Sequence, residues 1–394
     1  MRVLHLTTEY PPVVYGGLGT ALGGLTVALA RAGVEVGVLV AGSRAAYGLP
    51  GEQPLSVPRV TAERRDGLTI FWCDDSAPME TAVRLVRWWK PDVVHLHVFW
   101  LADTARLIKE RTGTPLVYHV HSLDRAEYEI GHEGSQCLDQ WDTQRQIISA
   151  ADRVIVLSES ERALLTSYVP EVTSRLAIVG NGIDDQAPPH ARRRGRRVLF
   201  TGRFVNRKGI HELLAAIPAV AAAVPDATFV LAGGHRNCTA AEMRSHWIGP
   251  PQEPYGRRIE FTGWLDAPQM SRLYRESDVL VIPSWYEPFG MVVLEGMMNG
   301  IAIVAANTGG PAEILEHERT ALLVPPRDAP ALAAALARVL LDDSLRRRLV
   351  TAAARQVRRK WLWSSQVSLF RNVYADASRP VEHTISNGSG YVAA

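Results

Sequence analysis

The chain alternates between short apolar runs and amphipathic stretches along most of its length. In the first half, the runs rich in valine, isoleucine and leucine are RVLHLT, VEVGVLV, DVVHLH, PLVYHV and RVIVLS. Helical periodicity occupies the stretches 19–32, 79–90, 101–111 and 139–150. Near-continuous apolar strands that alternate with helices are typical of a parallel sheet covered on both faces. The first half therefore predicts one doubly wound α/β domain.

The second half repeats this rhythm. Its apolar runs are RVLFTG, ATFVLAGG, RIEFTGW, DVLVIPS, IAIVAA and ALLV. Its helical stretches are 209–223, 267–276, 290–299 and 328–341, followed by 343–358 and 361–376. The segment DDQAPPHARRRGRR, at about 184–196, shows neither the apolar runs of the strands nor the periodicity of the helices.

We therefore expect an α/β protein of two domains, 1–185 and 186–360. A helix over 361–380 follows them, and 381–394 has no apolar period and is expected to be a mobile tail. A length of 394 residues with 47% hydrophobic content is enough for two separate cores.

Charge and cysteine content narrow the function classes. The net charge is only +2, with both signs mixed through most of the chain, so no global field favours nucleic acid or an anionic membrane. The arginine-rich stretch 191–200 is interpreted as a solvated linker, which leaves nucleic-acid binding as a remote alternative. Cys73, Cys137 and Cys238 lie too far apart for a zinc motif or a disulfide framework. With no membrane span or leader evident, we expect a cytoplasmic protein without integral membrane association.

Ligands of doubly wound sheets bind beyond the carboxyl ends of the strands, so the residues that follow each strand are the candidates. After the first strand comes EYPPVVYGGLGTALGG, residues 9–24. Gly16, Gly17 and Gly19 would let the backbone approach a ligand, and amides at a helix start favour anionic groups. The loop is too long for the dinucleotide fingerprint, and no acidic residue ends the second strand. A tight turn with close helix packing stays open as the structural alternative.

Histidines occur in the predicted strands DVVHLH and PLVYHV and directly after the second of them. His95, His97 and His119 lie inside strands, where buried, hydrogen-bonded histidines are the common outcome. His121 follows the second of these strands, so its side chain can reach a ligand between the domains. A loop histidine without a role is the alternative.

The segment FTGRFVNRKGIHELL places two cations between a strand and a helix. Arg203 and Lys208 can clamp a diphosphate, the arginine in bidentate fashion and the lysine as a point charge. The chain holds four lysines, Lys90, Lys109, Lys208 and Lys360, among abundant arginines. A lysine in this loop is therefore more informative than one in a lysine-rich chain.

Two glutamates stand out in the stretch 283–315. Glu287 lies in the turn after the strand DVLVIP, and Glu295 lies about two turns into a helix that ends at Gly300. An acid in a mostly apolar helix is costly unless it has polar partners, such as sugar or ribose hydroxyls. The sequence therefore predicts a polar ligand at this point.

Two backbone segments of the same stretch offer amide donors. The helix start at Phe289, Gly290 and Met291 has free amides directed toward the interdomain space. After the next strand, NTGGPAEI supplies a second donor loop at 308–310.

At this point the sequence resembles the retaining glycosyltransferases of family four, the large group that includes glycogen-synthase-like enzymes. The resemblance covers roughly residues 1–376, and its most specific part is the Glu-x7-Glu pair in EPFGMVVLE, followed by GGPAEI and joined to the GRFVNRKG context. It implies the GT-B fold, in which two Rossmann-like domains face a cleft and a C-terminal helix crosses back to the first domain.

The resemblance also implies roles for the donor-binding residues. Arg203 and Lys208 would hold the donor diphosphate, together with the loop amides of Gly16 and Gly17. Glu295 would bind the ribose hydroxyls.

The remaining roles concern the transferred sugar and the base. Glu287 would bind hydroxyls of the sugar, and His121 would match the active-site histidine of the family. Backbone groups near 289–291 would contact the sugar, and those near Trp264 and Leu265 would read the base.

The implied reaction moves a hexosyl unit from a nucleotide sugar to an acceptor with retention at the anomeric carbon. No Asp-x-Asp pair is evident near a strand end, so we expect no metal and no cofactor, with Arg203 and Lys208 neutralising the leaving group. A same-face displacement needs no enzymic nucleophile, and we favour Glu287 as a sugar-binding residue over a nucleophile. UDP is the favoured nucleotide because it is the commonest in the family.

Departures from the family pattern bear on the substrate. Val14 stands where bacterial glycogen synthases carry lysine, and Phe289 where they tend to have cysteine. We therefore expect a small-molecule or glycoside acceptor, for example in bacterial secondary metabolism, with an α-glucan synthase using ADP- or UDP-glucose as the alternative. A catalytically inactive nucleotide-sugar-binding protein, an inverting GT-B enzyme and an epimerase are less favoured.

The acceptor is expected on the first domain, where one stretch is rich in acids. A solvated helix face is the favoured interpretation, and recognition of a cationic acceptor is the other. The acidic residues of the stretch are Asp124, Glu127, Glu129, Glu133, Asp139 and Asp142.

Overall fold

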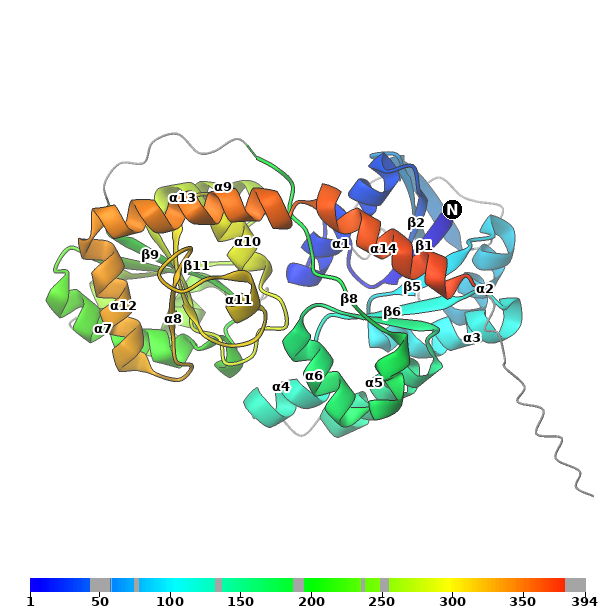
Figure 1. The fold of residues 1–394 in the computed structure, drawn as a ribbon, viewed down its shortest axis with the longest axis horizontal. Helices are drawn as coiled ribbons and strands as arrows, with labels where there is room; N and C mark the ends of the chain where they lie inside the picture. Colours follow the sequence, from blue (N-terminus) through cyan, green and yellow to red (C-terminus); the bar gives the residue numbers. More distant parts are fainter. Residues whose placement is uncertain are drawn as a thin grey trace, which may run out of the picture.

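The computed structural model describes residues 1–42, 57, 59–73, 78–131, 137–186, 195–234, 238–248 and 255–379. Two α/β bodies lie side by side along the long axis of the molecule (Figure 1). We call the body built on strands β1 to β8 the first domain, and the body built on β9 to β14 the second domain. The two-domain α/β architecture expected from the apolar runs is confirmed.

The sheet of the first domain has the order β3-β4-β2-β1-β5-β6-β7-β8. All neighbours are parallel except β3 and β4. The strands are β1 (Arg2–Thr7), β2 (Glu35–Ala41), β3 (Val60–Arg65), β4 (Leu68–Cys73), β5 (Val93–Leu96), β6 (Leu116–Val120), β7 (Arg153–Val156) and β8 (Leu176–Ile178).

The β3–β4 hairpin and β8 are absent from the sequence-based prediction. Asp66 and Gly67 join β3 to β4, and both have positive φ, 54° and 82°. An Asp-Gly pair between two β-rich runs is a strong hairpin signal, because only such residues readily adopt these angles. That signal could have revealed the antiparallel edge.

Helices cover both faces of this sheet. On one face α2, α3 and α5 pack over a core that includes Leu4, Leu96 and Val156. On the other face α1 packs over Val3, Val36 and Val117. The helices are α1 (Gly17–Arg31), α2 (Pro78–Trp89), α3 (Ala102–Thr112), α4 (Asp124–Gly131), α5 (Cys137–Ala150) and α6 (Glu159–Tyr168), with short 3-10 turns η2 (Phe99–Leu101) and η3 (Pro170–Arg175).

The sheet of the second domain is fully parallel, with the order β11-β10-β9-β12-β13-β14. Its six strands fall within the six apolar runs of the second half. They are β9 (Arg197–Gly202), β10 (Thr228–Gly233), β11 (Ile259–Gly263), β12 (Val279–Ile282), β13 (Ala302–Ala306) and β14 (Leu322–Val324).

Side-chain caps fix where several helices of this domain begin. Asp266 forms a capping box with Gln269 at the start of α9, and Asp328 caps α12 through the amide of Ala331. The elements are η4 (Asn206–Lys208), α7 (Ile210–Ala223), α8 (Ala240–Ile248), η5 (Gly256–Arg258), α9 (Ala267–Glu276), α10 (Met291–Met298), α11 (Gly309–Ile314), α12 (Ala329–Leu341) and α13 (Asp343–Lys360).

The last helix, α14 (Trp363–Ala377), lies on the first domain although it follows α13 of the second (Figure 1). Trp363, Phe370 and Tyr374 of α14 are buried in the core that α1 also covers. Ile183, in the segment that leaves the first domain, pairs with the chain at the start of α14: its amide donates to Trp361 O at 2.8 Å, and Trp363 N donates to its carbonyl at 3.1 Å. The two chain segments that connect the domains therefore lie side by side.

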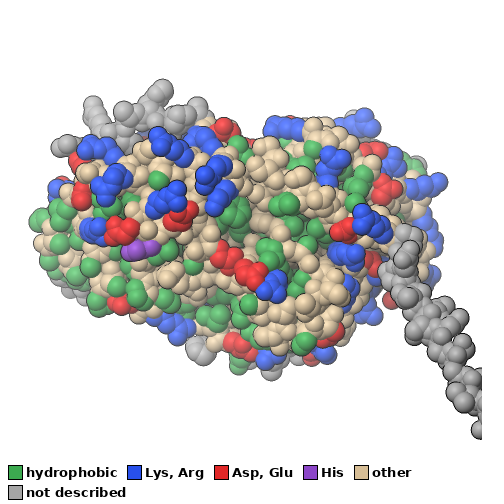
Figure 2. Space-filling model, viewed as in Figure 1, with side chains coloured by type: hydrophobic (Ala, Val, Ile, Leu, Met, Phe, Trp, Pro, Cys, Tyr) green, Lys and Arg blue, Asp and Glu red, His purple; other side chains and the backbone are tan. Residues whose placement is uncertain are grey.

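Charges of both signs are interspersed over the face seen in Figure 2, with basic side chains more frequent over α13. Of the arginine-rich stretch 191–200, residues 191–194 lie outside the described residues, as do 381–394. Arg196 pairs with Asp226 at 2.6 Å, and Arg197 pairs with Glu260 at 2.9 Å. No helix among the described residues has the length and apolarity to cross a bilayer.

Candidate functional site

The candidate site of the second domain lies where its strand order reverses direction. From β9 the chain goes to β10 on one side, whereas β12 lies on the other side of β9. The loops after β9 and β12 therefore diverge at neighbouring strand ends, which is the usual ligand position of a doubly wound sheet. Arg203 and Lys208 follow β9, and Glu287 follows β12.

Lys208 and Glu287 meet at this point in a mostly buried ion pair. Lys208 Nζ donates to Glu287 Oε2, and the side chains are 18% and 11% exposed. Burial alone would raise the pKa of Glu287, but the Lys208 ammonium holds this pKa below its usual value. Burial lowers the pKa of Lys208, and the Glu287 carboxylate opposes that shift. The pair therefore places one basic and one acidic group between the two loops.

Arg203 adds further positive charge to this pair. It lies within Coulombic reach of Glu287, whose pKa it also lowers, and of Glu9 in the first domain. Burial raises the pKa of Glu9, and Arg203 opposes that rise. Arg203 therefore faces both the β12 loop and the segment after β1.

The glycine-rich loop closes over Glu9. The Glu9 carboxylate accepts a hydrogen bond from the amide of Tyr15, and a Cβ on Gly19 would lie 2.8 Å from Glu9 Oε2. A Cβ on Gly17 would meet Met291 Cγ of α10 at 3.5 Å, whereas Gly16 faces open space. Gly19 is thus closely packed against Val14 and Glu9, and Gly17 brings the loop against the second domain.

Helix α10 begins at the same place and carries the second glutamate. Gly290 has φ of +92° and directs the chain into the helix at Met291. Glu295 lies further along α10 and accepts a hydrogen bond from Tyr274 Oη at 2.5 Å. Burial raises the pKa of Glu295. The Phe289 side chain is buried and packs edge-on against Trp361 at 5.5 Å, so this residue can offer a ligand only its backbone.

The segment 308–310 forms a helix start instead of the expected loop. Thr308 is the N-cap of α11, and Gly309 and Gly310 are its first residues. Gly309 has φ of +54°, and a Cβ there would lie 2.4 Å from Glu287 O. Gly310 N donates to the same carbonyl at 2.9 Å. These glycines support the Glu287 backbone, so the Gly310 amide is not available to a ligand.

His121 lies just after β6, as expected, at the end of a histidine array in the first domain. His5, His95, His97 and His119 are all buried, as predicted for the last three. The hydrogen bonding expected with this burial is not found for His119, whose two ring nitrogens have no partner among the described residues. His5 Nδ1 shares a hydrogen bond with His97 Nε2 at 2.9 Å, and His97 Nδ1 shares one with His121 Nε2 at 3.0 Å.

Burial lowers the pKa of His5 and of His121 to about 3, so these rings are neutral at physiological pH. The sequence reasoning missed His5 and the convergence of the array. Its signal was the pair of His-x-His repeats with a third histidine in the strand RVLHLT.

A polar contact that the sequence reasoning missed joins the two domains beside the Lys208–Glu287 pair. Arg207 is buried and forms an ion pair with Glu127 of α4 at 2.9 Å. Tyr286 Oη donates to Glu161 Oε2 of α6 at 3.0 Å and accepts from Leu123 N at 3.0 Å. The residues next to the site are therefore fixed by groups from the opposite domain.

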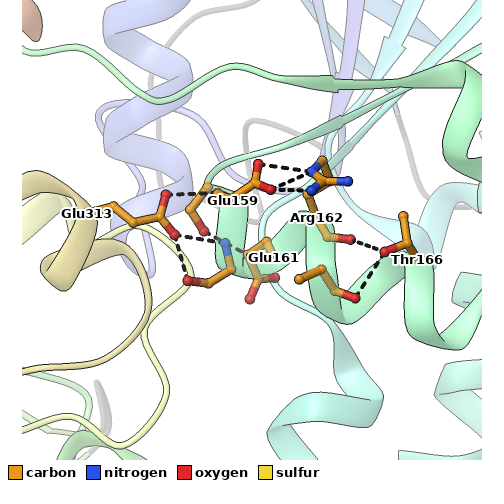
Figure 3. A network of polar contacts seen from close by, with 8 residues as sticks. Glu159, Glu161, Arg162, Thr166 and Glu313 are labelled. Atoms are coloured by element: carbon orange, nitrogen blue, oxygen red, sulfur yellow. Dashed lines mark hydrogen bonds and ion pairs between the residues drawn. The ribbon is translucent and has the colours of Figure 1, made fainter.

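A second interdomain contact involves Glu313 of α11 and the start of α6 (Figure 3). The Glu313 carboxylate accepts hydrogen bonds from the amides of Glu159 and Ser160, each at 2.8 Å, and from Ser160 Oγ at 2.6 Å. The first amides of a helix have no intrahelical partner, and a carboxylate there is favourable. An acid of the second domain thus caps a helix of the first.

The other predicted groups occupy separate positions. Trp264 and Leu265 follow β11 and are half-buried, with Leu265 packed against the core that contains α10. In the acidic stretch, Glu129 binds Arg125 at 2.7 Å, and Asp142 lies 3.9 Å from Arg145.

Asp124 differs from these paired acids. Its buried Oδ2 has no partner among the described residues, and burial raises its pKa to about 6. Glu133 and the side chain of Asp139 lie outside the described residues.

Two family models match the chain and together cover most of it. The Glycosyl transferase 4-like domain matches residues 16–182, and Glycosyl transferases group 1 matches residues 195–342. The glycogen synthase of Mycobacterium tuberculosis is 30% identical over 96% of this chain and 95% of its own.

Solved structures agree on the fold. The sucrose-phosphate synthase of Thermosynechococcus elongatus has a TM-score of 0.76 and 24% identity, over 95% of this chain and all of the other. Anabaena Alr3699/HepE in complex with UDP-glucose has a TM-score of 0.69 and 19% identity, over 96% and 99% of the two chains. The chain belongs to the family-four glycosyltransferases of the glycogen-synthase-like type, with the GT-B fold.

Proposed function

We propose that the protein is a retaining glycosyltransferase that moves a hexosyl unit from a nucleoside diphosphate sugar, with UDP favoured, to a small-molecule or glycoside acceptor. The observation that carries this proposal is the buried Lys208–Glu287 pair at the strand-order reversal of the second domain, with Arg203 beside it. In this proposal, residues 1–185 form the acceptor-side domain and residues 186–360 form the donor-binding domain. Residues 361–380 form the C-terminal helix that crosses back to the first domain.

The donor's charge explains why cations gather here. A nucleoside diphosphate leaving group develops negative charge on its phosphates, and preorganised cations stabilise that charge most effectively in a site shielded from water. Arg203 and Lys208 would supply this stabilisation, with the amides of Gly16 and Gly17 on the facing loop. Glu295 would bind the ribose, and the backbone near Trp264 and Leu265 would contact the base.

The pairing of Glu287 favours sugar binding over nucleophilic attack. One oxygen of its carboxylate is engaged by Lys208, which lowers its basicity and fixes its orientation. A same-face displacement, in which the departing phosphate takes the acceptor proton, needs no protein nucleophile. His121 would lie beside the transferred sugar, and no metal would be required in the reaction.

An α-glucan synthase is the second candidate, and the 30% identity to the mycobacterial glycogen synthase favours it. Val14 argues against an α-glucan synthase, because a valine offers no charge toward a donor phosphate. Its side chain packs closely against Gly19: a Cβ on Gly19 would lie 2.7 Å from Val14 Cγ1. Incubation with ADP-glucose and UDP-glucose, with and without a glucan primer, separates the two: elongation of the primer would favour the synthase.

The proposal is tested by thermal-shift measurements with nucleoside diphosphates and their sugars. A ligand that binds only the folded state raises Tm, and we expect one diphosphate to do so in the native protein but not in Lys208→Ala. Lys109→Ala is the matched control, because Lys109 pairs with Asp152 at 2.8 Å on the first domain. No stabilisation by any nucleoside diphosphate would refute the donor assignment, and an inverted product by NMR would refute retention.

A further inference from the structure

The histidine array of the first domain has a composition that packing alone does not explain. On one face of the sheet, near the starts of β1, β5 and β6, lie Val3, Val93 and Val117, which belong to an apolar core. Toward their carboxyl ends the same face carries five histidines. They are His5, His95, His97, His119 and His121.

Strand geometry brings these rings together. Residues two apart on a strand point to the same face, so each His-x-His repeat presents both rings on one side. His5 is aligned with His95 across β1 and β5. Ring centroids are 4.1 Å apart for His95 and His97, and 4.2 Å apart for His119 and His121.

The hydrogen bonding of the array is incomplete. Neither ring nitrogen of the buried His119 has a partner among the described residues, and the Nε2 atoms of His5 and His95 have none either. His95 Nδ1 bonds Tyr374 Oη of α14 at 2.8 Å. A buried polar group without a partner is costly, so a protein rarely keeps several unless something satisfies them.

We propose that His97, His119 and His121 form a binding site for one divalent transition-metal ion of the imidazole-preferring kind, such as Zn²⁺. Candidate ligand atoms of these three residues all lie within 4.8 Å of one another. His97 Nδ1 and His121 Nε2 are 3.0 Å apart, close to the ~3.3 Å between two nitrogens on one tetrahedral zinc ion with bonds of about 2.0–2.1 Å. Rotation of the His119 ring supplies the third ligand.

The neighbours of this triad suit a metal ligand set. With His97 Nδ1 on the ion, the proton of His97 resides on Nε2 and is donated to His5 Nδ1, a contact already present. Ligating histidines usually make such an outer hydrogen bond, which fixes their tautomer.

The triad also leaves a coordination position for solvent. His121 is only half-buried, whereas His97 and His119 are buried, so the ion has a route of entry and its fourth position can hold water or hydroxide. A second triad, His5 with His95 and His97, has similar spacing but lies wholly in the core, so we favour the triad that includes His121.

Metal analysis after dialysis of the full chain against Zn²⁺ tests this site. We expect native protein to retain one more zinc ion than His119→Gln, and Zn²⁺ to raise Tm in the native protein but not in the variant. His246→Gln, which removes an exposed histidine of α8, is the control and should match the native protein. Because His119 is in the core, His121→Gln at the strand end provides a second variant that should also lose the ion.

Cobalt substitution supplies an independent readout. A tetrahedral Co²⁺ site gives intense visible absorption, which we expect in the native protein and not in His121→Gln. Equal zinc retention by all four proteins, or Co²⁺ spectra that do not depend on His119 and His121, would overturn the proposal.

One consequence rests on the proposed function. Because His121 is the histidine placed beside the transferred sugar, zinc bound to it would compete with the donor, and Zn²⁺ should inhibit transfer reversibly, with activity restored by a chelator. The retention and Co²⁺ measurements test the site itself, so they remain decisive if no transfer is found.

Discussion

Lys208 and Glu287 form a buried ion pair that joins the loops after β9 and β12, although 79 positions separate them in the chain. Arg207 and Arg203 also lower the pKa of Glu287, but the largest of these favourable contributions comes from Lys208. Removing one partner of such a pair leaves an uncompensated buried charge, which costs about 3–5 kcal/mol. The pair therefore affects both stability and donor binding.

Lys208→Met should lower the free energy of unfolding by about 3 kcal/mol, because it leaves the Glu287 carboxylate without its partner. Lys208→Met combined with Glu287→Gln should recover much of this loss but bind no nucleoside diphosphate. Urea unfolding and calorimetric titration measure the two effects. Lys109→Met, which breaks the more exposed pair with Asp152, should cost about 1 kcal/mol or less and leave diphosphate binding intact. Equal costs for the two lysines would contradict the role of burial.

Because Glu313 of the second domain caps α6 of the first, replacing it should destabilise the start of α6. Glu313→Ala removes the acceptor for the amides of Glu159 and Ser160, and loss of a cap costs about 1 kcal/mol. Hydrogen exchange at these two amides should accelerate, while exchange in the core of β1 should not change. Glu316→Ala breaks only an exposed pair with Arg319 and should leave α6 unaffected. Unchanged exchange at the start of α6 in Glu313→Ala would show that the cap does not hold in solution.

Glu161 predicts a pH dependence of stability. Burial raises its pKa to about 8 from an ordinary value of 4.5, so the folded state favours the protonated carboxyl. The stability that this group contributes is complete below pH 4.5 and is lost as pH rises through about 8. Each unit of pKa difference corresponds to ~1.4 kcal/mol, so the loss is on the order of a few kcal/mol.

Glu161→Gln should flatten this dependence, because an amide does not titrate. Urea unfolding at pH 5 to pH 9 measures it, with Glu171→Gln, at an exposed position of η3, as the control that should keep the native slope. Native protein that gains stability between these limits relative to Glu161→Gln would contradict the sign.

The glycines of α11 predict a backbone effect on the site. Gly309→Ala places a Cβ in a left-handed conformation and 2.4 Å from Glu287 O, so Glu287 must move. We expect donor affinity to fall at least tenfold in a calorimetric titration. Gly33→Ala is the matched control, because Gly33 also has positive φ, +81°, but faces open space. It should cost about 1 kcal/mol of stability and leave affinity unchanged.

Periodicity in the sequence predicted most of the fold and several candidate residues. The apolar runs correspond to the core strands because buried parallel strands must be apolar on both faces. Three strands escaped this reasoning. The strand β4 (LTIFWC) is apolar but was missed together with the Asp-Gly turn that joins it to β3. The strand β3 reads VTAERR and pairs only at an edge, and β8 has three residues. Local composition reflects how deeply a segment is buried, so edge strands and short strands have only a weak sequence signal.

The candidate site shows the same division. The sequence by itself determined that Lys208, Glu287 and His121 follow strands, and the strand-end rule made them candidates. Only the tertiary structure decided that Lys208 pairs with Glu287, that Arg207 reaches Glu127 of the other domain, and that His5 and His97 meet across 92 positions. The physical reason is that the burial of a side chain follows from the pattern of residues next to it in the sequence. Its interaction partner, in contrast, depends on strand order and on how the two domains pack.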